Sequence, residues 1–425
     1  MTTAPEPRWD RPTLVGCAPS SGSTLFSGML DAHPDVLCGP DLSLFSHPHF
    51  WLGEGVEWAT RLHHLLDPSV NASREADWVW DGGRGFVPYV PPVSETALEW
   101  YGVDVHQVRG SLMAGLHPQE AIRTIMGTRL ARAGKSFWAE KSPANLYGMN
   151  AFLRRYPEGR GIAVVRDGRD VIGSLLNRGW NFWRAVATWL VEAGLCMSLS
   201  RDRRVLVVKY EDLVKDARGS LSKVCEFLGL PDAVDRMANP AAHSDRLKTD
   251  VSLRTKAWTS RPDQPVNDKA VGRWRKELSP LQLGMLSTAA VIRNVPGLEE
   301  IGGVTFPEAL RFFEYSDLEP PPSPLPDAAV MAYAQALTPP GFPTPFPMSY
   351  VDFPSLSGGR QLVGGMLFWI EGQIEVLTRK NRELEQQLEV LRAQKAKLEH
   401  KLLMKTGRVG ALRELAGRNR DLDAT

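Results

Sequence analysis

Short apolar runs separated by stretches of helical length constrain the fold of this 425-residue chain more than any other feature. A short run that is apolar throughout is typical of a strand buried on both faces, as in a parallel sheet covered by helices. The runs are Thr13–Cys17, Ser136–Lys141, Gly161–Asp167 and Val205–Tyr210. The sequence therefore predicts the α/β class, with a buried, mostly parallel sheet flanked by helices.

The first apolar run leads directly into a turn of small residues, LVGCAPSSGSTLF, from Leu14 to Phe26. Unpaired amides at a helix N-terminus, together with glycine and small hydroxyl side chains, form a site that suits a phosphate. A Walker A loop needs a lysine before its hydroxyl residue, and this turn has none, which disfavours ATP phosphoryl transfer. The turn predicts a P-loop-like phosphate site, and the alternative is an ordinary strand, turn and helix.

A second stretch, VVRDGRDVIGSLLNRGW, carries charged and hydroxyl groups at helical spacing. Arg166 follows a predicted strand, and Ser174 and Arg178 share one face of the predicted helix. Arginine forks and a hydroxyl group that converge in this way suit a dianionic phosphate. The alternative is a solvated helix whose charged residues at 167–170 pair locally.

Charge and cysteine content narrow the class of protein. A formal net charge of +1 gives no general attraction to nucleic acid or to anionic membranes, so anion binding depends on local sites. The 4 cysteines are scattered without metal-ligand spacing and are expected to be reduced and mostly buried. No apolar stretch has the length of a membrane span, and the N-terminus lacks the apolar core of a signal peptide. We expect a cytoplasmic protein that contains no metal. We also expect that it binds neither nucleic acid nor membranes.

Composition divides the chain into segments. We expect an α/β domain over residues 13–312, with an aromatic-rich insertion at 42–135 that forms a lid or a pocket. Prolines crowd residues 313–360, and this density predicts a linker or a wrapping arm. Residues 361–405 are expected to form a C-terminal coiled-coil helix, followed by a tail at 406–425.

Leucines recur at the heptad interval in the predicted coiled coil, at Leu377, Leu384, Leu391 and Leu398. Asn381 occupies the other core position, where an asparagine favours a parallel two-stranded coil in a fixed register. The heptads therefore predict a homodimer, and the alternative is a single helix packed on the main domain.

Taken in order, these motifs resemble those of the sulfotransferase family, whose donor is 3′-phosphoadenosine 5′-phosphosulfate (PAPS), and especially the branch with tyrosylprotein and many bacterial sulfotransferases. The resemblance spans roughly residues 13–278 and rests on CAPSSGSTLFSGMLDAHPDVLCGPD, AEKSPANL, VVRDGRDVIGSLLNR, VVKYEDLVKD with CEFLGLP, and PVNDKAVGRWRKELS. It implies a P-loop-like sheet and transfer of a sulfuryl group to a hydroxyl or amine of a small-molecule, carbohydrate or peptidic acceptor.

The resemblance also implies which residues bind the donor. Those expected around the 5′-phosphosulfate are Ser20, Ser21, Gly22, Ser23 and Thr24. Those expected at the 3′-phosphate are Arg166, Ser174 and Arg178. Those expected along the rest of the nucleotide are Tyr210, the segment 258–267 and Arg273, with a core position at a strand end as the alternative for Tyr210.

Two further residues carry the chemistry that the resemblance implies. Lys141 stands where the family has the lysine that stabilises charge on the sulfuryl and leaving oxygens, and its alternative is a pair with Glu140. Asp41 aligns with the family's catalytic glutamate, which takes the acceptor proton. We prefer Asp41 as the base over its rivals in the sequence, which are His33, His47 and His49.

The chain departs from the family pattern at two positions. Ser20 stands where relatives have arginine or lysine, so one cationic contact to the donor is absent. Relatives with a secretory disulfide pair the residue that matches Cys38 with a cysteine at the position of Ala139, and its absence agrees with a reducing compartment. Two other functions stay open on the sequence, a nucleotide-binding scaffold that has lost turnover and a small-molecule kinase of related fold.

Overall fold

A five-stranded parallel sheet forms the centre of the fold, in the strand order β2-β3-β1-β4-β5. Its strands are β1 (Thr13–Cys17), β2 (Val36–Cys38), β3 (Phe137–Lys141), β4 (Arg160–Val165) and β5 (Val205–Lys209). The predicted α/β class and parallel sheet are confirmed. The sequence did not indicate β2, because a run of three apolar residues is too short to stand out.

The computed structural model describes residues 6–42, 44–45, 95–104, 106–108, 118–180, 182–250, 253, 261–292, 294, 300–316, 318 and 351–352. The chain divides into two compact units, Met1–Met366 and Leu367–Thr425, and every described residue belongs to the first. The predicted coiled coil at 361–405 and the tail lie outside the described residues.

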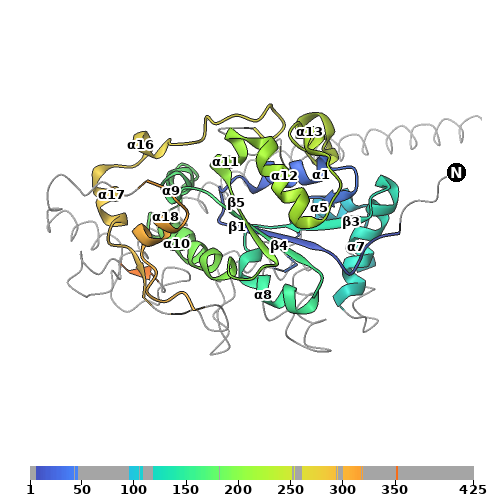
Figure 1. Cartoon of the computed structure of the whole chain (residues 1–425), viewed down its shortest axis with the longest axis horizontal. Coiled ribbons are helices and arrows are strands. Elements are labelled where there is room, and N and C mark those ends of the chain that lie inside the picture. Colours follow the sequence, from blue (N-terminus) through green and yellow to red (C-terminus); the bar gives the residue numbers. More distant parts are fainter. Residues whose placement is uncertain are drawn as a thin grey trace, which may run out of the picture. The chain divides into compact units, whose positions relative to one another are not determined.

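Both faces of the sheet are covered by helices, as fully apolar strands require. Leu14 of β1 belongs to an apolar cluster with α8 (Asn145–Arg155) and α10 (Phe182–Leu199). Its neighbour Val15 points to the opposite face, into a cluster with α1 (Ser23–Ala32) and α12 (Ala217–Leu228). Figure 1 shows α1 and α12 on one side of the strands and α8 on the other.

The remaining helices connect or flank this three-layer core. They are α5 (Glu95–Tyr101), α7 (Pro118–Ala133), α9 (Gly168–Leu176), α11 (Tyr210–Lys215), α13 (Val234–Met237), α14 (Pro240–His243), α15 (Asp245–Thr249), α16 (Trp274–Glu277), α17 (Pro280–Leu286) and α18 (Phe306–Phe312). Among the described residues, no helix combines the length and the apolar character needed to cross a bilayer.

Only parts of the predicted insertion at 42–135 are described. Its helix α5 is fastened to the core, since the Trp100 indole donates to Thr249 Oγ1 at 2.8 Å and the Tyr101 hydroxyl donates to the Pro40 carbonyl at 3.2 Å. Residues 46–94, on which the predicted lid or pocket depends, lie outside the described part, so that prediction is untested.

The segment predicted as a linker at 313–360 returns to the main domain at two described places. Strand β7 (Val351–Asp352) pairs antiparallel with β6 (Ala290–Val291), and the Trp183 indole donates to the Val351 carbonyl at 3.2 Å. Near the start of the segment, the Tyr315 hydroxyl donates to Glu211 Oε2 at 2.7 Å. These contacts are those of an arm that packs on the domain.

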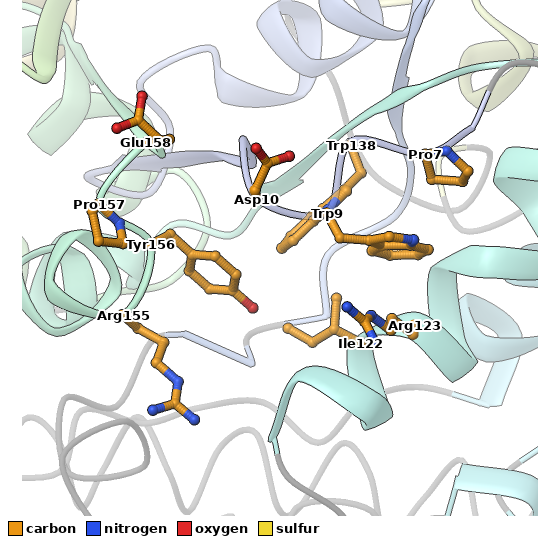
Figure 2. Close-up of a pocket in the computed structure, with 10 residues that line it drawn as sticks. All are labelled: Pro7, Trp9, Asp10, Ile122, Arg123, Trp138, Arg155, Tyr156, Pro157 and Glu158. Atoms are coloured by element: carbon orange, nitrogen blue, oxygen red, sulfur yellow. The ribbon is translucent and has the colours of Figure 1, made fainter.

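The two edges of the sheet differ in character. At the amino ends of the strands, an aromatic cavity of about 470 Å³ is lined by Trp9, Trp138 and Tyr156, among others (Figure 2). Trp9 precedes β1 and Trp138 lies near the start of β3, and their ring centroids are 6.4 Å apart. The two predicted phosphate-binding motifs follow the carboxyl ends of β1 and β4, so they lie at the opposite edge.

Candidate functional site

The loop between β1 and α1 presents backbone amides as an anion site requires. Ser20 and Gly22 both have left-handed backbone conformations, with φ of 71° and 84°. Helix α1 begins at Ser23 without a side-chain cap and without an acidic residue in its first turn. A left-handed turn that leads into an uncapped helix N-terminus forms a concave nest of N–H groups, which favours an anionic ligand.

A cavity of about 560 Å³ opens above this loop and brings together nearly all the predicted site residues. Parallel strands place their carboxyl ends at one edge, so the loops after all five strands converge there. The predicted residues that line the cavity are Ser20, Gly22, Ser23, Thr24, Asp41, Lys141, Arg166, Ser174, Arg178, Tyr210 and Arg273. The predicted residue that does not line it, Ser21, is fully buried.

Two arginines approach one another on the β4 side of the cavity. Arg166 and Arg178 both line it, and burial together with the charge of Arg166 lowers the pKa of Arg178. Like charges held close together favour an anionic ligand that neutralises both. Ser174, one helical turn before Arg178, lines the same wall and adds a hydroxyl donor.

Arg166 also holds the P-loop-like turn between β1 and α1. The side chain is 5% exposed, and Nη1 donates to the Ser20 carbonyl at 2.9 Å while Nη2 donates to the Ala270 carbonyl. Its guanidinium lies over the ring of Tyr210, 5.0 Å from the centroid. Arg166 therefore links the loop after β1 to the segment around residue 270.

The charged residues at 167–170 are buried, so they do not form the solvated helix face considered as the alternative. Arg169 does pair locally with Asp167, at 2.7 Å. Asp170 is 1% exposed and accepts from the amides of Gly272 at 2.7 Å and Trp274 at 2.8 Å. These bonds fix the segment that brings Arg273 to the cavity, where it pairs with Glu277.

Tyr210 packs its ring against Gly22 and is 4% exposed. A Cβ atom at Gly22 would collide with the Tyr210 ring, so glycine is required there both for its positive φ and for this close approach. Tyr210 is thus a buried residue and a cavity-lining residue at once.

Lys141 and Asp41 form an ion pair inside the cavity. Lys141 Nζ lies 2.6 Å from Asp41 Oδ1, with the lysine side chain 1% exposed and the aspartate side chain 31% exposed. Glu140, the alternative partner considered for Lys141, instead accepts from Ser142 Oγ at 2.6 Å and Asn145 Nδ2 at 2.6 Å. The buried lysine and the partly exposed aspartate therefore meet where the loops after β2 and β3 converge.

His33 does not line this cavity and lies in a turn. Its Nδ1 accepts from the Asp35 amide and its Nε2 donates to the Pro231 carbonyl, both at 3.0 Å. Burial lowers the pKa of His33, which favours the neutral ring. His47 and His49, the other two rivals of Asp41, lie outside the described residues.

Sequence reasoning missed Arg246, which reaches Asp41 from α15. Its Nη2 donates to Asp41 Oδ1 at 2.9 Å, and the side chain is 2% exposed. Asp41 and Arg246 are separated by 205 positions, and no motif of the sequence links them.

The cysteines Cys17, Cys38, Cys196 and Cys225 are free and buried, as expected. Burial raises the pKa of Cys17 and of Cys38 to about 12, so both thiols are protonated at neutral pH. Cys38 of β2 lies directly opposite Ala139 of β3 in the sheet register. The disulfide that the resemblance describes in relatives would therefore join neighbouring strands.

A parallel sheet, an amide nest after its first strand and an arginine pair after its fourth define an α/β protein with a P-loop-like site for a phosphate-bearing ligand. A sequence model of the Sulfotransferase family matches residues 12–235. This match covers more than half of the chain, and the protein belongs to the Sulfotransferase family.

Individual relatives carry the same name. Protein-tyrosine sulfotransferase 2 of Gallus gallus is 24% identical over 279 residues, which are 61% of this chain and 62% of that protein. A putative protein-tyrosine sulfotransferase of Caenorhabditis briggsae is 23% identical over 297 residues, 67% of this chain and 88% of that protein. This chain thus spans less than two thirds of the length of the Gallus gallus relative.

Among solved structures, the sulfotransferase domain of the olefin synthase from Synechococcus PCC 7002 matches with a TM-score of 0.43 and 22% identity. The match covers 65% of this chain and 92% of that one.

Replacing Gly22 by alanine tests the nest. We expect Gly22→Ala to destabilise the fold by more than the ~1–2 kcal/mol of a left-handed alanine, because Tyr210 must also move. Gly303→Ala is the matched control, since Gly303 also has a positive φ and has nothing within 4 Å of its added Cβ. Thermal unfolding of both variants measures the difference, and equal losses of stability would contradict the packing of Tyr210 on Gly22.

Proposed function

We propose that this protein transfers the sulfuryl group of PAPS to a hydroxyl or amine of an acceptor. The observation that carries the proposal is one cavity that holds an amide nest, an arginine pair and a lysine–aspartate pair. Membership of the Sulfotransferase family supports the same reaction. PAPS carries phosphate groups on both sides of its ribose, which matches two separate anion sites in one cavity.

Different residues of the cavity suit different parts of PAPS. The amides at the start of α1, with the hydroxyl groups of Ser23 and Thr24, suit the 5′-phosphosulfate. Ser174 and Arg178 suit the 3′-phosphate. Arg166 contributes its charge there and holds the loop through the Ser20 carbonyl.

Asp41 and Lys141 suit the transfer step. The acceptor oxygen or nitrogen attacks sulfur, the bond from sulfur to the 5′-phosphate oxygen breaks, and Asp41 takes the acceptor proton. A protonated Asp41 no longer attracts Lys141, so the ammonium group is released to stabilise the charge on the leaving phosphate of adenosine 3′,5′-bisphosphate. The ion pair thereby couples deprotonation of the acceptor to stabilisation of the leaving group.

The acceptor is proposed from the relatives alone. Two relatives are named protein-tyrosine sulfotransferases, which makes a peptide with a tyrosine hydroxyl the first acceptor to test. The absence of a basic side chain at Ser20 favours a second candidate function, a donor-binding scaffold with little turnover. Release of adenosine 3′,5′-bisphosphate in the presence of tyrosine peptides supports the enzyme, and donor binding without release supports the scaffold.

The 3′-phosphate site predicts a selective loss of affinity. Arg178→Ala should weaken binding of adenosine 3′,5′-bisphosphate about 10- to 100-fold, because it removes one charge-assisted contact, and should change binding of adenosine 5′-phosphate much less. Isothermal titration calorimetry measures both ligands, with the exposed Arg203→Ala as the control. An equal loss for the two ligands would contradict the assignment of Arg178 to the 3′-phosphate.

The transfer step predicts a loss of rate rather than of affinity. Asp41→Asn and Lys141→Ala should each lower the turnover number by about a hundredfold or more, because they remove the base and the cation of the transition state. Asp41→Asn should leave the affinity for adenosine 3′,5′-bisphosphate nearly unchanged in the same titrations. Normal turnover of Asp41→Asn would assign the base to another residue.

We also propose that the heptads at 361–405 pair two chains. The support is the leucine register with Asn381 in the second core position. The cytoplasmic location likewise stays a prediction of the sequence.

Light scattering tests the pairing. The intact chain should have the mass of a dimer, and a chain truncated at Gly359 should have the mass of a monomer, because the leucine register lies beyond that point. An intact chain that is monomeric at micromolar concentration would show that the heptads do not pair chains.

A further inference from the structure

We propose that Arg246 is the positioning residue of Asp41, whose carboxyl group it holds in place before and after the acceptor proton is taken. The inference rests on the proposed function, and it assigns a role to a residue that lies outside the matched family segment at 12–235. It is carried by the contacts of Arg246, by the anchoring of α15 and by the charge balance around Asp41.

The Arg246 side chain is fixed by contacts from three segments of the chain. Nη2 donates to Asp41 Oδ1 at 2.9 Å, and Nη1 donates to Ser27 Oγ on α1. Nε lies 3.8 Å from Asp250 Oδ2 at the end of α15. A planar guanidinium that is hydrogen-bonded through both Nη atoms and lies beside the carboxylate of a third residue keeps one orientation, so it imposes that orientation on Asp41.

The backbone of Arg246 is also anchored by hydrogen bonds, to α1. Asp31 of α1 is 1% exposed, and its Oδ2 accepts from the Arg246 amide and from Ser244 Oγ, both at 2.9 Å. Ser244 in turn caps α15 by accepting from the Leu247 amide at 3.1 Å. Lys135 balances the charge of Asp31, with Nζ 3.1 Å from Oδ1. Helix α15 is therefore tied to α1, the same helix whose N-terminus forms the amide nest.

Charge explains why Arg246 stays with Asp41. Burial opposes the positive charge of Arg246, but the neighbouring carboxylates of Asp41 and Asp250 raise its pKa above the usual value. The guanidinium therefore stays charged throughout the reaction. Lys141 and Arg246 share Oδ1 of Asp41, so the Asp41 carboxyl group keeps its contact with Arg246 when Lys141 turns to the leaving phosphate. Arg246 thus keeps Asp41 an anion before it takes the acceptor proton, and holds the carboxyl group in place afterwards.

Three acids in the described part of the chain also lie close enough to Asp41 to interact with its charge. They are Glu140 of β3, Cys17 of β1 and Tyr101 of α5. Burial raises the pKa of each of them, and an acid beside Asp41 gives its anion no support. Removal of Arg246 therefore removes a cation that pairs with the base, so we expect the active anion of Asp41 to be lost at a higher pH.

The test compares Arg246→Met, Arg246→Lys and a control in the full-length protein. Arg129→Met is the control, because the Arg129 guanidinium of α7 reaches α15 as well but pairs there with Asp245 and not with Asp41. Each variant is measured for thermal unfolding, for affinity for adenosine 3′,5′-bisphosphate, and for turnover number against pH with PAPS and a tyrosine-containing peptide as acceptor.

We expect Arg246→Met to lower the turnover number about tenfold or more and to move the acid limb of the pH profile upward by about one unit, with ligand affinity within about threefold of wild type. Arg246→Lys should have an acid limb close to that of wild type, because lysine keeps the positive charge. Its turnover number should lie between those of Arg246→Met and wild type, because lysine lacks the two Nη donors of the guanidinium. Arg129→Met should leave the pH profile unchanged. If Arg246→Met does not fold, the rate and pH profile of Arg246→Lys decide.

Three negative results are distinguishable. Wild-type protein that binds the bisphosphate without any turnover contradicts the proposed function, and the role of Arg246 in it. Active wild-type protein with an unchanged rate and pH profile in the Arg246 variants contradicts the role of Arg246 alone. A loss of ligand affinity that matches the loss of rate would assign Arg246 to the stability of the donor site instead.

Discussion

The parallel pairing of β1 with β3 and β4 is the constraint on which the rest of the structure depends. Parallel strands end at the same edge of the sheet, so residues more than a hundred positions apart in the sequence meet there. The amide nest follows β1, Lys141 ends β3 and Arg166 follows β4. An antiparallel pairing of any of these strands would send one of the three groups to the opposite edge, where the aromatic cavity lies.

The loop after β1 is held by packing as much as by its own turn. Gly22 admits the ring of Tyr210, and the guanidinium of Arg166 covers that ring while it binds the Ser20 carbonyl. One arginine thus connects the two proposed phosphate sites. In the proposed complex with PAPS, both phosphate-bearing ends of the donor would therefore contact residues that Arg166 connects.

Two acids of the described residues meet cations that come from other parts of the fold. Asp31 meets Lys135, and Asp41 meets both Lys141 and Arg246. A buried ion without such a partner would be strongly destabilising, so these pairs fix the elements that carry them. The same pairs place a base and a cation within contact of each other in the cavity, which is how the stability of the core and the proposed chemistry come to depend on the same residues.

The sequence by itself determined four of the five central strands and the motifs that follow them, because buried parallel strands are continuously apolar and a phosphate loop needs small residues at fixed spacing. The family resemblance of these motifs then implied a set of site residues from Ser20 to Arg273, and all of them except Ser21 line one cavity. Only the tertiary structure decided that Lys141 pairs with Asp41 instead of Glu140, and that Arg246 joins them. Such contacts depend on which side chains the fold brings together from distant parts of the sequence. Neither the spacing of motifs nor the composition contains that information.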